Sequence, residues 1–355
     1  MNKNRLHIWT SLLLALLLTV GMLALVACSP DDDKDTGDPT TEEPSEVEEA
    51  PSEYPVTVEG VTVRSRPSRV ISLSPALTEK LFDLGLEDAL VGVSDNCDYP
   101  AAAEGLPRCG TVLLPKLDAI KDLKPHLVLT QTDLDEETLI ALQQMDVDVV
   151  AIPTASSVAE WKKSYVSLAR LLEGEYSGGD MGERFAQNIQ DRLDYLEGYL
   201  VPYAQENGVK PALYLRLLDF NVATGDTLEN ELMAVIGLDN IASEQTGWLF
   251  PEEEANGSGR AAFESVRVMY MDEAFVTIKD LERSTYYKGL QATLKDWYLY
   301  IDSIVFERQS LRMLDTLADM AAYAYPDAVP QTAHVADAGE IEWADEDGES
   351  EDDAA

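Results

Sequence analysis

Basic residues are scarce in this sequence of 355 residues, where 26 Lys and Arg stand against 66 Asp and Glu to give a formal net charge of −40. Such a balance argues against nucleic-acid binding, because nothing here could neutralise a row of phosphates and release their counterions. An anionic membrane surface would repel the chain as well. The acids are unevenly spread, since residues 31–53 and residues 337–355 each contribute a net charge of −10. The part between them is only moderately acidic.

Histidine is also rare, and of His7, His126 and His334 only His126 lies in the central part of the chain. A zinc site built on histidine therefore lacks ligands. The sequence has no nucleophile-elbow motif, no phosphate-binding glycine loop and no dinucleotide-binding fingerprint. We therefore expect no enzymatic activity, no resident cofactor and no metal. A pair of catalytic carboxylates, as in glycosidases, is not excluded because acids are plentiful, but nothing in the sequence singles out one pair.

The N-terminus has the layout of a secretory signal, in which a short basic start is followed by an apolar run over residues 12–27. The run ends in Leu25-Val26-Ala27-Cys28, which resembles the bacterial lipobox, where the Cys thiol is diacylated and cleavage makes it the new N-terminus. Two acyl chains suffice for stable anchoring. Residues 1–28 are thus expected to be a lipoprotein signal peptide ending at lipidated Cys28. An uncleaved transmembrane helix is the alternative.

The other two cysteines, Cys97 and Cys109, lie twelve positions apart. A disulfide between them is one interpretation for an exported protein, and closing that loop would contribute about 3 kcal/mol. Two buried free thiols are the second interpretation. Contact of a sulfur with a ligand is the third.

Low apolar content marks both flanks of the mature chain. Residues 29–54 are rich in Pro, Thr, Ser and Glu, and residues 331–355 are strongly acidic. Neither composition can bury enough surface to fold. We expect an acidic disordered tether and an acidic disordered tail.

Strands that alternate with helices predict an α/β fold with mostly parallel sheets. The alternation runs over residues 55–178, which we expect to form an N-terminal lobe, and restarts over residues 208–330 for a C-terminal lobe. Between them, residues 179–207 predict one bridging helix, because apolar residues from Phe185 to Leu200 recur at helical spacing. A ligand cleft is then expected between the lobes.

A weak internal repeat supports two related lobes. The helical segment 78–86 parallels segment 230–238, and each contains a Gly-Leu pair at its end. A second parallel joins residues 117–120 to residues 263–266, each followed by an expected strand. In the second copy that strand is placed at Phe275-Val276-Thr277-Ile278.

Several stretches resemble one family, the solute-binding lipoproteins of ABC importers for cobalamin, iron-siderophores and haem. The matching stretches are Pro67 to Pro75 with Thr78-Glu79 and Leu84-Gly85, Val91-Gly92-Val93-Ser94, Cys97-Asp98-Tyr99-Pro100, Leu123-Lys124-Pro125 and Phe306 to Arg312. The resemblance covers roughly residues 67–325. It implies two α/β lobes joined by one long, rather rigid helix, a shallow ligand cleft between the lobes and a location on the outer face of the cell membrane.

In that family each lobe presents a carboxylate to an Arg pocket on the membrane permease. The matching positions here are Asp118 and Glu264. Two acids, one on each lobe, could fix register and orientation through charge-assisted contacts. The alternative is that each acid only stabilises the first turn of its own helix.

Strand ends and the loops after them face the cleft in such lobes. This rule nominates the following ligand-binding residues: Ser74, Pro75, Asn96, Tyr99, Gln131, Arg216, Phe220 and Trp248. The alternative is that Tyr99 and Trp248 are packing residues and Arg216 a surface cation. Clefts of cobalamin binders are rich in Trp and Tyr, and this sequence departs from that pattern. An inward Arg216 would suit an anionic ligand, such as a ferric siderophore or a haem propionate.

Together these patterns predict a monomeric, non-enzymatic extracellular lipoprotein. It would capture a metal chelate, either a ferric siderophore, haem or cobalamin, and deliver it to the permease subunits of an ABC importer. Two other functions stay open. One is an exported hydrolase acting in the interlobe cleft, and the other is a surface interaction protein that keeps the fold without transport.

Overall fold

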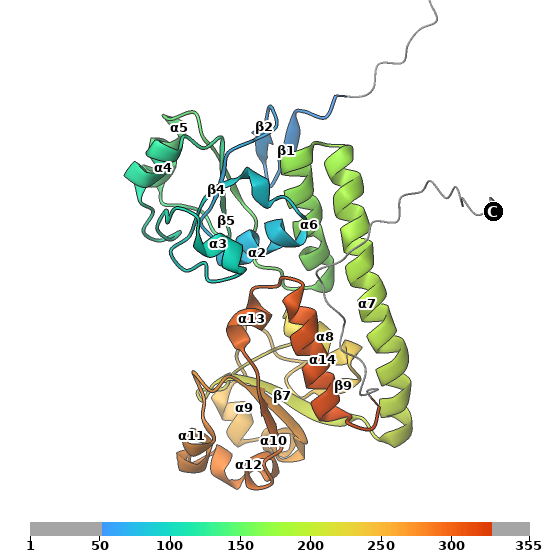
Figure 1. Cartoon of the computed structure of the whole chain (residues 1–355). Coiled ribbons are helices and arrows are strands. Elements are labelled where there is room, and N and C mark those ends of the chain that lie inside the picture. The colour runs from blue at the N-terminus through green and yellow to red at the C-terminus, as the bar shows by residue number, and fades with distance from the viewer. Residues whose placement is uncertain (1–51, 329–355) are drawn as a thin grey trace, which may run out of the picture. The chain divides into compact units, whose positions relative to one another are not determined.

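The computed structural model describes residues 52–328, which belong to one compact unit of the chain (Figure 1). The expected signal peptide with lipidated Cys28, most of the tether and the acidic tail lie outside these residues. Within the described part, no helix is both long and apolar enough to cross a bilayer.

The first lobe contains a sheet of four parallel strands in the order β4-β3-β5-β6. In chain order they are β3 (Val70–Ser72), β4 (Leu90–Val93), β5 (Leu127–Thr130) and β6 (Asp148–Ala151). Strands β3 and β5 are buried throughout, as expected for a sheet covered on both faces. The helices of this lobe are α2 (Pro75–Asp83), α3 (Ala101–Glu104), α4 (Leu117–Leu123), α5 (Glu136–Gln143) and α6 (Val158–Glu173), with a 3-10 turn η1 (Glu87–Ala89).

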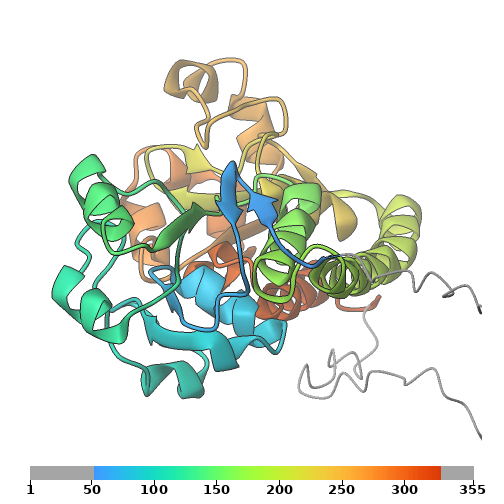
Figure 2. The ribbon, with the colours of Figure 1, turned by 90° about the horizontal axis from the view of Figure 1, so that it is seen from above.

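A small antiparallel hairpin precedes this sheet. Its strands are β1 (Val56–Val58) and β2 (Val61–Val63). The hairpin lies beside α6, as the view from above shows (Figure 2). Val56, Val58 and Val63 bury their side chains in the same apolar cluster as the α6 residues.

The expected bridging helix is present as α7 (Ser177–Asn207), which has 31 residues and would be about 46 Å long. It lies beside α6 of the first lobe and α8 (Leu228–Val235) of the second (Figure 1). Two glycines let α6 and α7 approach closely. A Cβ at Gly178 would lie 2.3 Å from Ala169 O, and one at Gly182 would lie 2.5 Å from Val166 Cα. Any larger residue there would push the two helices apart.

The second lobe contains a five-stranded sheet. Its strands are β7 (Lys210–Leu217), β8 (Asn221–Val222), β9 (Leu238–Asn240), β10 (Val268–Met271) and β11 (Tyr298–Tyr300). β9 and β10 run parallel to β7, β11 runs parallel to β10, and β8 runs antiparallel to β7. The remaining helices are α9 (Glu252–Asn256), α10 (Arg260–Ser265), α11 (Ile278–Arg283), α12 (Gln291–Leu294), α13 (Ser303–Glu307) and α14 (Arg312–Ala324), with a 3-10 turn η2 (Tyr287–Gly289).

The two sheets share one parallel topology, as the weak repeat indicated. The order β4-β3-β5-β6 in the first lobe corresponds to β9-β7-β10-β11 in the second. The helices α2 and α8 also correspond. Each begins at a hydroxyl N-cap, Ser74 or Thr227, and each is followed by a glycine of positive φ, 69° at Gly85 and 74° at Gly237. The prediction of two α/β lobes with mostly parallel sheets is therefore confirmed.

One predicted strand is wrong. Residues 275–278 form a turn and the start of α11, and the strand of this region is β10, seven residues earlier. Thr277 caps α11 in a capping box, where its side chain accepts from the backbone N–H of Asp280 and the Asp280 carboxylate accepts from the N–H of Thr277. Local hydrogen bonding therefore outweighs the strand propensity of a β-branched run.

Candidate functional site

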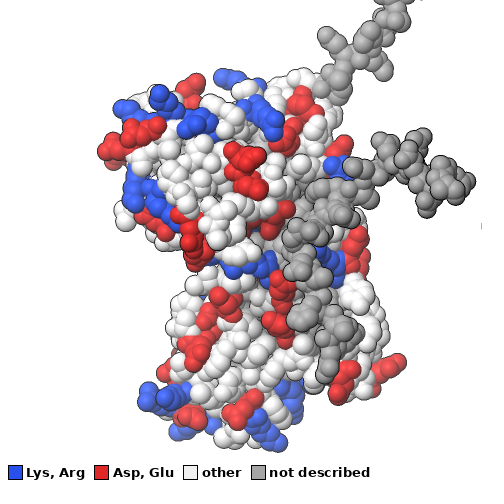
Figure 3. Space-filling view, viewed as in Figure 1, with Lys and Arg blue, Asp and Glu red and all other residues white. Residues whose placement is uncertain are grey.

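A cleft of about 960 Å³ lies between the lobes and is lined by residues from both of them. Pro75, Asn96 and Gln131 follow the carboxyl ends of β3, β4 and β5, and Arg216 lies near the end of β7. Parallel sheets place their ligands at this edge, because the loops after the strands are free to carry specific side chains. The volume falls in the usual range for sites that hold small molecules. Side chains of both signs lie side by side where the lobes meet (Figure 3).

Five of the eight residues nominated from the sequence line this cleft. They are Pro75, Asn96, Gln131, Arg216 and Trp248. Ser74 is buried behind the residues that line the cleft. Its hydroxyl donates to Gln131 Oε1 at 2.6 Å and accepts from the N–H of Leu77 at 3.2 Å, so it caps α2 and also orients Gln131.

The other two nominated residues lie elsewhere, which corrects their expected placement. Phe220 is 8% exposed and packs in the core of the second lobe, with its ring 4.9 Å from Tyr286 and 6.0 Å from Phe263. Tyr99 is 44% exposed and stacks on the Arg312 guanidinium at 4.0 Å. Neither side chain lines the cleft. Position after a strand identifies a loop, whereas the direction of a side chain within that loop depends on what packs around it.

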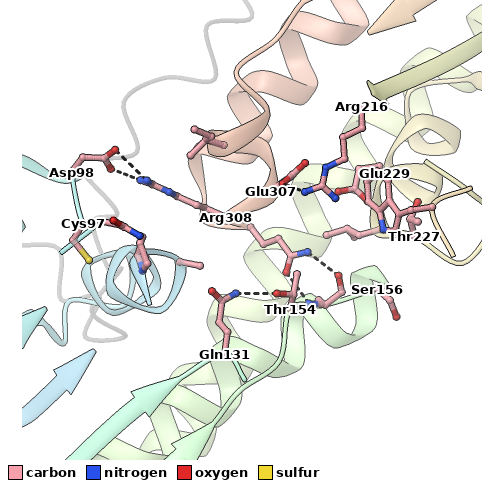
Figure 4. Close-up of a pocket in the computed structure, with 18 of the residues that line it drawn as sticks. Cys97, Asp98, Gln131, Thr154, Ser156, Arg216, Thr227, Glu229, Glu307 and Arg308 are labelled. Atoms are coloured by element: carbon pink, nitrogen blue, oxygen red, sulfur yellow. Dashed lines mark hydrogen bonds and ion pairs between the residues drawn. The ribbon is translucent and has the colours of Figure 1, made fainter. Parts of the chain in front are cut away.

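The wall of the first lobe carries neutral hydrogen-bonding groups beside the carboxylates of Asp95 and Asp98 (Figure 4). Gln131 Nε2 donates to Thr154 Oγ1 at 3.1 Å, and Ser156 Oγ donates to Glu160 Oε2 at 2.8 Å. The amide of Asn96 also faces the cleft. These groups offer donors and acceptors without a net charge.

Residues 306–312, at the end of α13 and the start of α14, are called the closing segment here. This segment supplies cleft residues that the sequence analysis missed. Gln309 is held in the first lobe, because its side chain exchanges two hydrogen bonds with the backbone of Ala155 at 2.9 and 2.7 Å. Its own carbonyl accepts from Trp161 Nε1 at 2.6 Å. Glu307 and Arg308 thereby reach the cleft (Figure 4). The stretch Phe306 to Arg312 carried the family resemblance, and that was the available signal.

Charged groups of the closing segment are paired. Arg308 Nη1 lies 2.7 Å from Glu79 Oε1, and Arg308 Nη2 lies 3.1 Å from Asp98 Oδ2. Glu307 Oε2 lies 3.1 Å from Arg216 Nη2. Both guanidiniums of the cleft are therefore neutralised by carboxylates of the protein itself, a pairing that the sequence analysis of Arg216 did not foresee.

Trp248 is the aromatic residue of the cleft and has an unusual backbone, with a φ of 61°. Bulky side chains rarely adopt this left-handed region, which costs about 1–3 kcal/mol. Asp226 supports the turn, because its carboxylate accepts from the N–H of Gly247 at 3.0 Å and from the Thr224 hydroxyl at 2.6 Å. Thr224 Oγ1 in turn accepts from the N–H of Trp248 at 3.1 Å. The indole then lies against Arg216, 5.2 Å from the guanidinium carbon.

Glu229 is a buried acid at the start of α8 that the sequence analysis also missed. It lines the cleft but is only 4% exposed. Burial raises its pKa from 4.5 to about 7, and the nearby charge of Glu307 adds to this shift. Burial also raises the pKa of Glu307, against the opposing effect of Arg216.

The raised pKa of Glu229 predicts a pH-dependent stability. Between pH 4.5 and about 7 the folded state binds more protons than the unfolded state, so stability falls as pH rises. We expect Glu229→Gln to remove this loss, and to be more stable than the native chain by up to about 3 kcal/mol at pH 8. Below the unfolded pKa the two chains should be equally stable. Urea unfolding across this range measures the difference.

The control is Glu206→Gln, which changes an exposed acid of α7 and should follow the native curve. Equal pH dependence in Glu229→Gln and the native chain would contradict a buried, proton-binding Glu229.

Cys97 and Cys109 are not joined, which corrects the disulfide interpretation: both are buried free thiols, and Cys97 also lines the cleft, so contact of its sulfur with a ligand stays a prediction. They belong to different apolar clusters, Cys97 with Leu77 and Cys109 with Ile71 and Val128. Cys97 Sγ lies 3.3 Å from Thr78 Oγ1. Burial raises the pKa of Cys97, and raises that of Cys109 to about 11, so both thiols are protonated near neutral pH.

The two acids that match the family's docking carboxylates are both exposed. Asp118 lies in the first turn of α4, as expected. Glu264 lies in the last turn of the short helix α10 instead, and its Oε1 lies 3.0 Å from Arg260 Nε. Stabilisation of a helix start can thus explain Asp118 but not Glu264.

Two related α/β lobes, one long connecting helix and a polar cleft at the strand ends define a two-lobed solute-binding protein. No group of three or more His, Cys, Asp and Glu side chains suited to a metal ion occurs in residues 52–328. The chain belongs to the periplasmic binding protein family, whose model matches residues 70–294. The resemblance inferred from the sequence is thereby confirmed.

Comparison with known proteins agrees with this assignment. The chain is 23% identical over 339 residues to an uncharacterized ABC transporter substrate-binding lipoprotein of Bacillus subtilis, covering 92% of this chain and 98% of that protein. It is 27% identical over 187 residues to the vitamin B12-binding protein of Yersinia pestis, covering 51% and 62%. A periplasmic heme-binding protein from Pseudomonas aeruginosa has a similar fold, with a TM-score of 0.61 at 20% identity, covering 74% of this chain and 95% of that one.

Proposed function

We propose that this protein captures a metal chelate outside the cell and delivers it to the permease of an ABC importer. The observation that carries the proposal is the polar cleft of about 960 Å³, built from the strand ends of two related lobes. The cleft is large enough for a ferric siderophore, a haem or the corrin part of a cobalamin. Family membership supports a binding function and does not support the exported hydrolase.

Anchoring and docking belong to the same proposal. The Bacillus subtilis relative, which this chain covers almost entirely, is named a lipoprotein, and this agrees with lipidation at Cys28. The mature chain would be a monomer on the extracytoplasmic face of the membrane. Asp118 and Glu264 would contact basic pockets of the permease, one from each lobe.

A titration with a panel of chelates tests the capture function. Calorimetry of the full-length chain in detergent should give one saturable site for at least one of cyanocobalamin, haem and several ferric siderophores. Of the three tryptophans in the described residues, Trp248 lines the cleft, whereas Trp161 and Trp297 do not, so the contribution of Trp248 to the fluorescence is a local second readout. Saturation by none of these chelates would contradict the proposal.

The matched control is Trp248→Phe. It removes the fluorophore of the cleft but keeps an aromatic ring there. We expect a smaller fluorescence change with a dissociation constant within about threefold of the native value, because a ring over Arg216 is retained. An undiminished signal from the variant, after correction for absorption by the ligand, would place the chelate outside the cleft.

A further inference from the structure

The charges that line the cleft are unequal. Five carboxylates face two guanidiniums among the described lining residues. The carboxylates are those of Asp95, Asp98, Asp226, Glu229 and Glu307, and the guanidiniums are those of Arg216 and Arg308. Asp98 and Glu307 are paired with the two guanidiniums and Glu229 is only 4% exposed, so the charge that an incoming ligand meets outside these pairs is negative and lies mainly at Asp226.

The pairing of Arg216 is decisive, since it is the cation nearest the aromatic residue of the cleft. Its guanidinium lies between the Trp248 ring, 5.2 Å away, and Glu307 Oε2, 3.1 Å away. Figure 4 shows Arg216 and Glu307 facing one another beside Glu229. That contact uses one of the five N–H donors of the guanidinium, and the Arg216 side chain is 41% exposed, so an anionic ligand could reach the other donors, but its charge would then lie beside that of Glu307.

The Arg308 guanidinium is also paired with carboxylates of the protein and so is poorly available to a ligand. Glu79 and Asp98 take its donors at 2.7 and 3.1 Å, and its side chain is 12% exposed. A third cation near the cleft, Lys116, is bound to Asp95 at 2.9 Å. Asp226 has no basic partner among the described residues, and the hydrogen bond from Thr224 lowers its pKa, so it keeps its charge.

We propose that the cleft selects a metal chelate whose net charge is zero or positive, and whose surface carries amide or other N–H donors, and that it rejects anionic chelates. This inference rests on the proposed function. The neutral wall formed by Asn96, Gln131 and Thr154 pairs with amide groups of a ligand, and the carboxylates of the second lobe accept from N–H donors or attract a cation. Ferric trihydroxamates and corrinoids both have this chemistry. Haem, with its propionates, and ferric tris-catecholates do not.

Calorimetric titration of the full-length chain in detergent separates the two groups. The neutral and cationic probes are ferrichrome, ferrioxamine B and cyanocobalamin, and the anionic probes are haem and ferric enterobactin. We expect at least one of the first group to bind about tenfold or more tightly than either anionic probe. Both ligand classes have the required charge and N–H donors, so binding of a trihydroxamate or of cyanocobalamin shows which class the cleft takes.

Glu307→Gln is the informative variant, because it frees the Arg216 guanidinium without changing the shape of the site. We expect the affinity for haem or ferric enterobactin to rise about tenfold and that for ferrioxamine B to fall. Asp239→Asn removes an exposed acid of the same lobe outside the cleft and should change neither affinity.

The outcomes distinguish this inference from the function on which it rests. An anionic probe that binds the native chain as tightly as the best neutral or cationic probe overturns the charge selection and leaves chelate capture standing. Unchanged affinities in Glu307→Gln overturn the role of the Arg216–Glu307 pair in that selection. If no probe binds, the proposed function fails, and the inference fails with it.

Discussion

Replacing both Asp118 and Glu264 with Lys should abolish chelate uptake in cells while leaving chelate affinity unchanged. Both acids are exposed, and α4 and α10 lie in different lobes (Figure 1). Neither residue lines the cleft. A like charge placed against a basic pocket costs several kcal/mol, so reversal at two such contacts should reduce uptake by far more than about tenfold.

The two single variants, Asp118→Lys and Glu264→Lys, should differ in how much they reduce chelate uptake. Glu264 already has Arg260 as a partner at 3.0 Å, and in the proposed docking it would exchange this contact for one with the permease. Replacing an existing exposed ion pair by a contact with the permease contributes less binding free energy than forming a contact from an unpaired acid. We therefore expect Asp118→Lys to reduce uptake more than Glu264→Lys.

The control for docking is Glu183→Lys, a charge reversal at an exposed position of α7. It should take up chelate at the native rate. Uptake is measured in cells with equal surface amounts of each variant, and affinity is measured by calorimetry. Native uptake by the double variant would refute the docking role of both acids.

The second large effect is expected at Glu79, a carboxylate of α2 that is 1% exposed. Its oxygens accept from Arg308 Nη1 at 2.7 Å, from Ser310 Oγ at 2.6 Å, and from Arg312 Nε and Nη2 at 2.9 and 2.7 Å. This buried carboxylate contacts two guanidiniums, of which Arg308 also pairs with Asp98, and it ties the closing segment to the first lobe. Glu79→Gln keeps the shape but leaves Arg308 with Asp98 as its only carboxylate partner, and Arg312 with none among the described residues.

We expect Glu79→Gln to lower the free energy of unfolding by about 3–5 kcal/mol, because breaking a buried pair leaves its partner charges uncompensated. Urea unfolding measures this change. The matched control is Glu59→Gln, which breaks the exposed pair between Glu59 and Lys163 at 3.0 Å and should cost less than about 1 kcal/mol. Similar losses in the two variants would contradict the stabilising role of the buried cluster.

A weaker chelate affinity should accompany the loss of stability in Glu79→Gln. Gln309 and Arg308 reach the cleft only because the closing segment is held against the first lobe. Binding measured well below the unfolding midpoint separates this local effect from global unfolding.

Much of the fold follows from local sequence patterns. Alternating strands and helices predicted both lobes, and apolar residues at helical spacing predicted α7. Ser74 caps α2 and Pro75 begins it, which is a local sequence pattern favourable at a helix N-terminus. Where this local reading failed, at residues 275–278, the capping box of Thr277 and Asp280 was the overlooked signal.

Local patterns also located much of the cleft. The carboxyl ends of parallel strands meet at one edge of a sheet, and Pro75, Asn96 and Gln131, which were nominated because each follows a strand, line the cleft. This rule depends on chain order alone. It could not say that the Phe220 side chain turns into the core, because that depends on the aromatic rings packed around it.

Only the tertiary structure decided the pairing of charges and thiols. Glu79 and Arg312 are 233 positions apart in the chain, and Arg216 and Glu307 are 91 apart, so no local pattern could join them. Cys97 and Cys109 are close in sequence, yet they lie in separate apolar clusters. Secondary structure depends on neighbours along the chain, and sequence reveals it. The sign of the charge that a ligand meets depends on which distant groups neutralise one another, and that is settled only when the lobes and the closing segment come together.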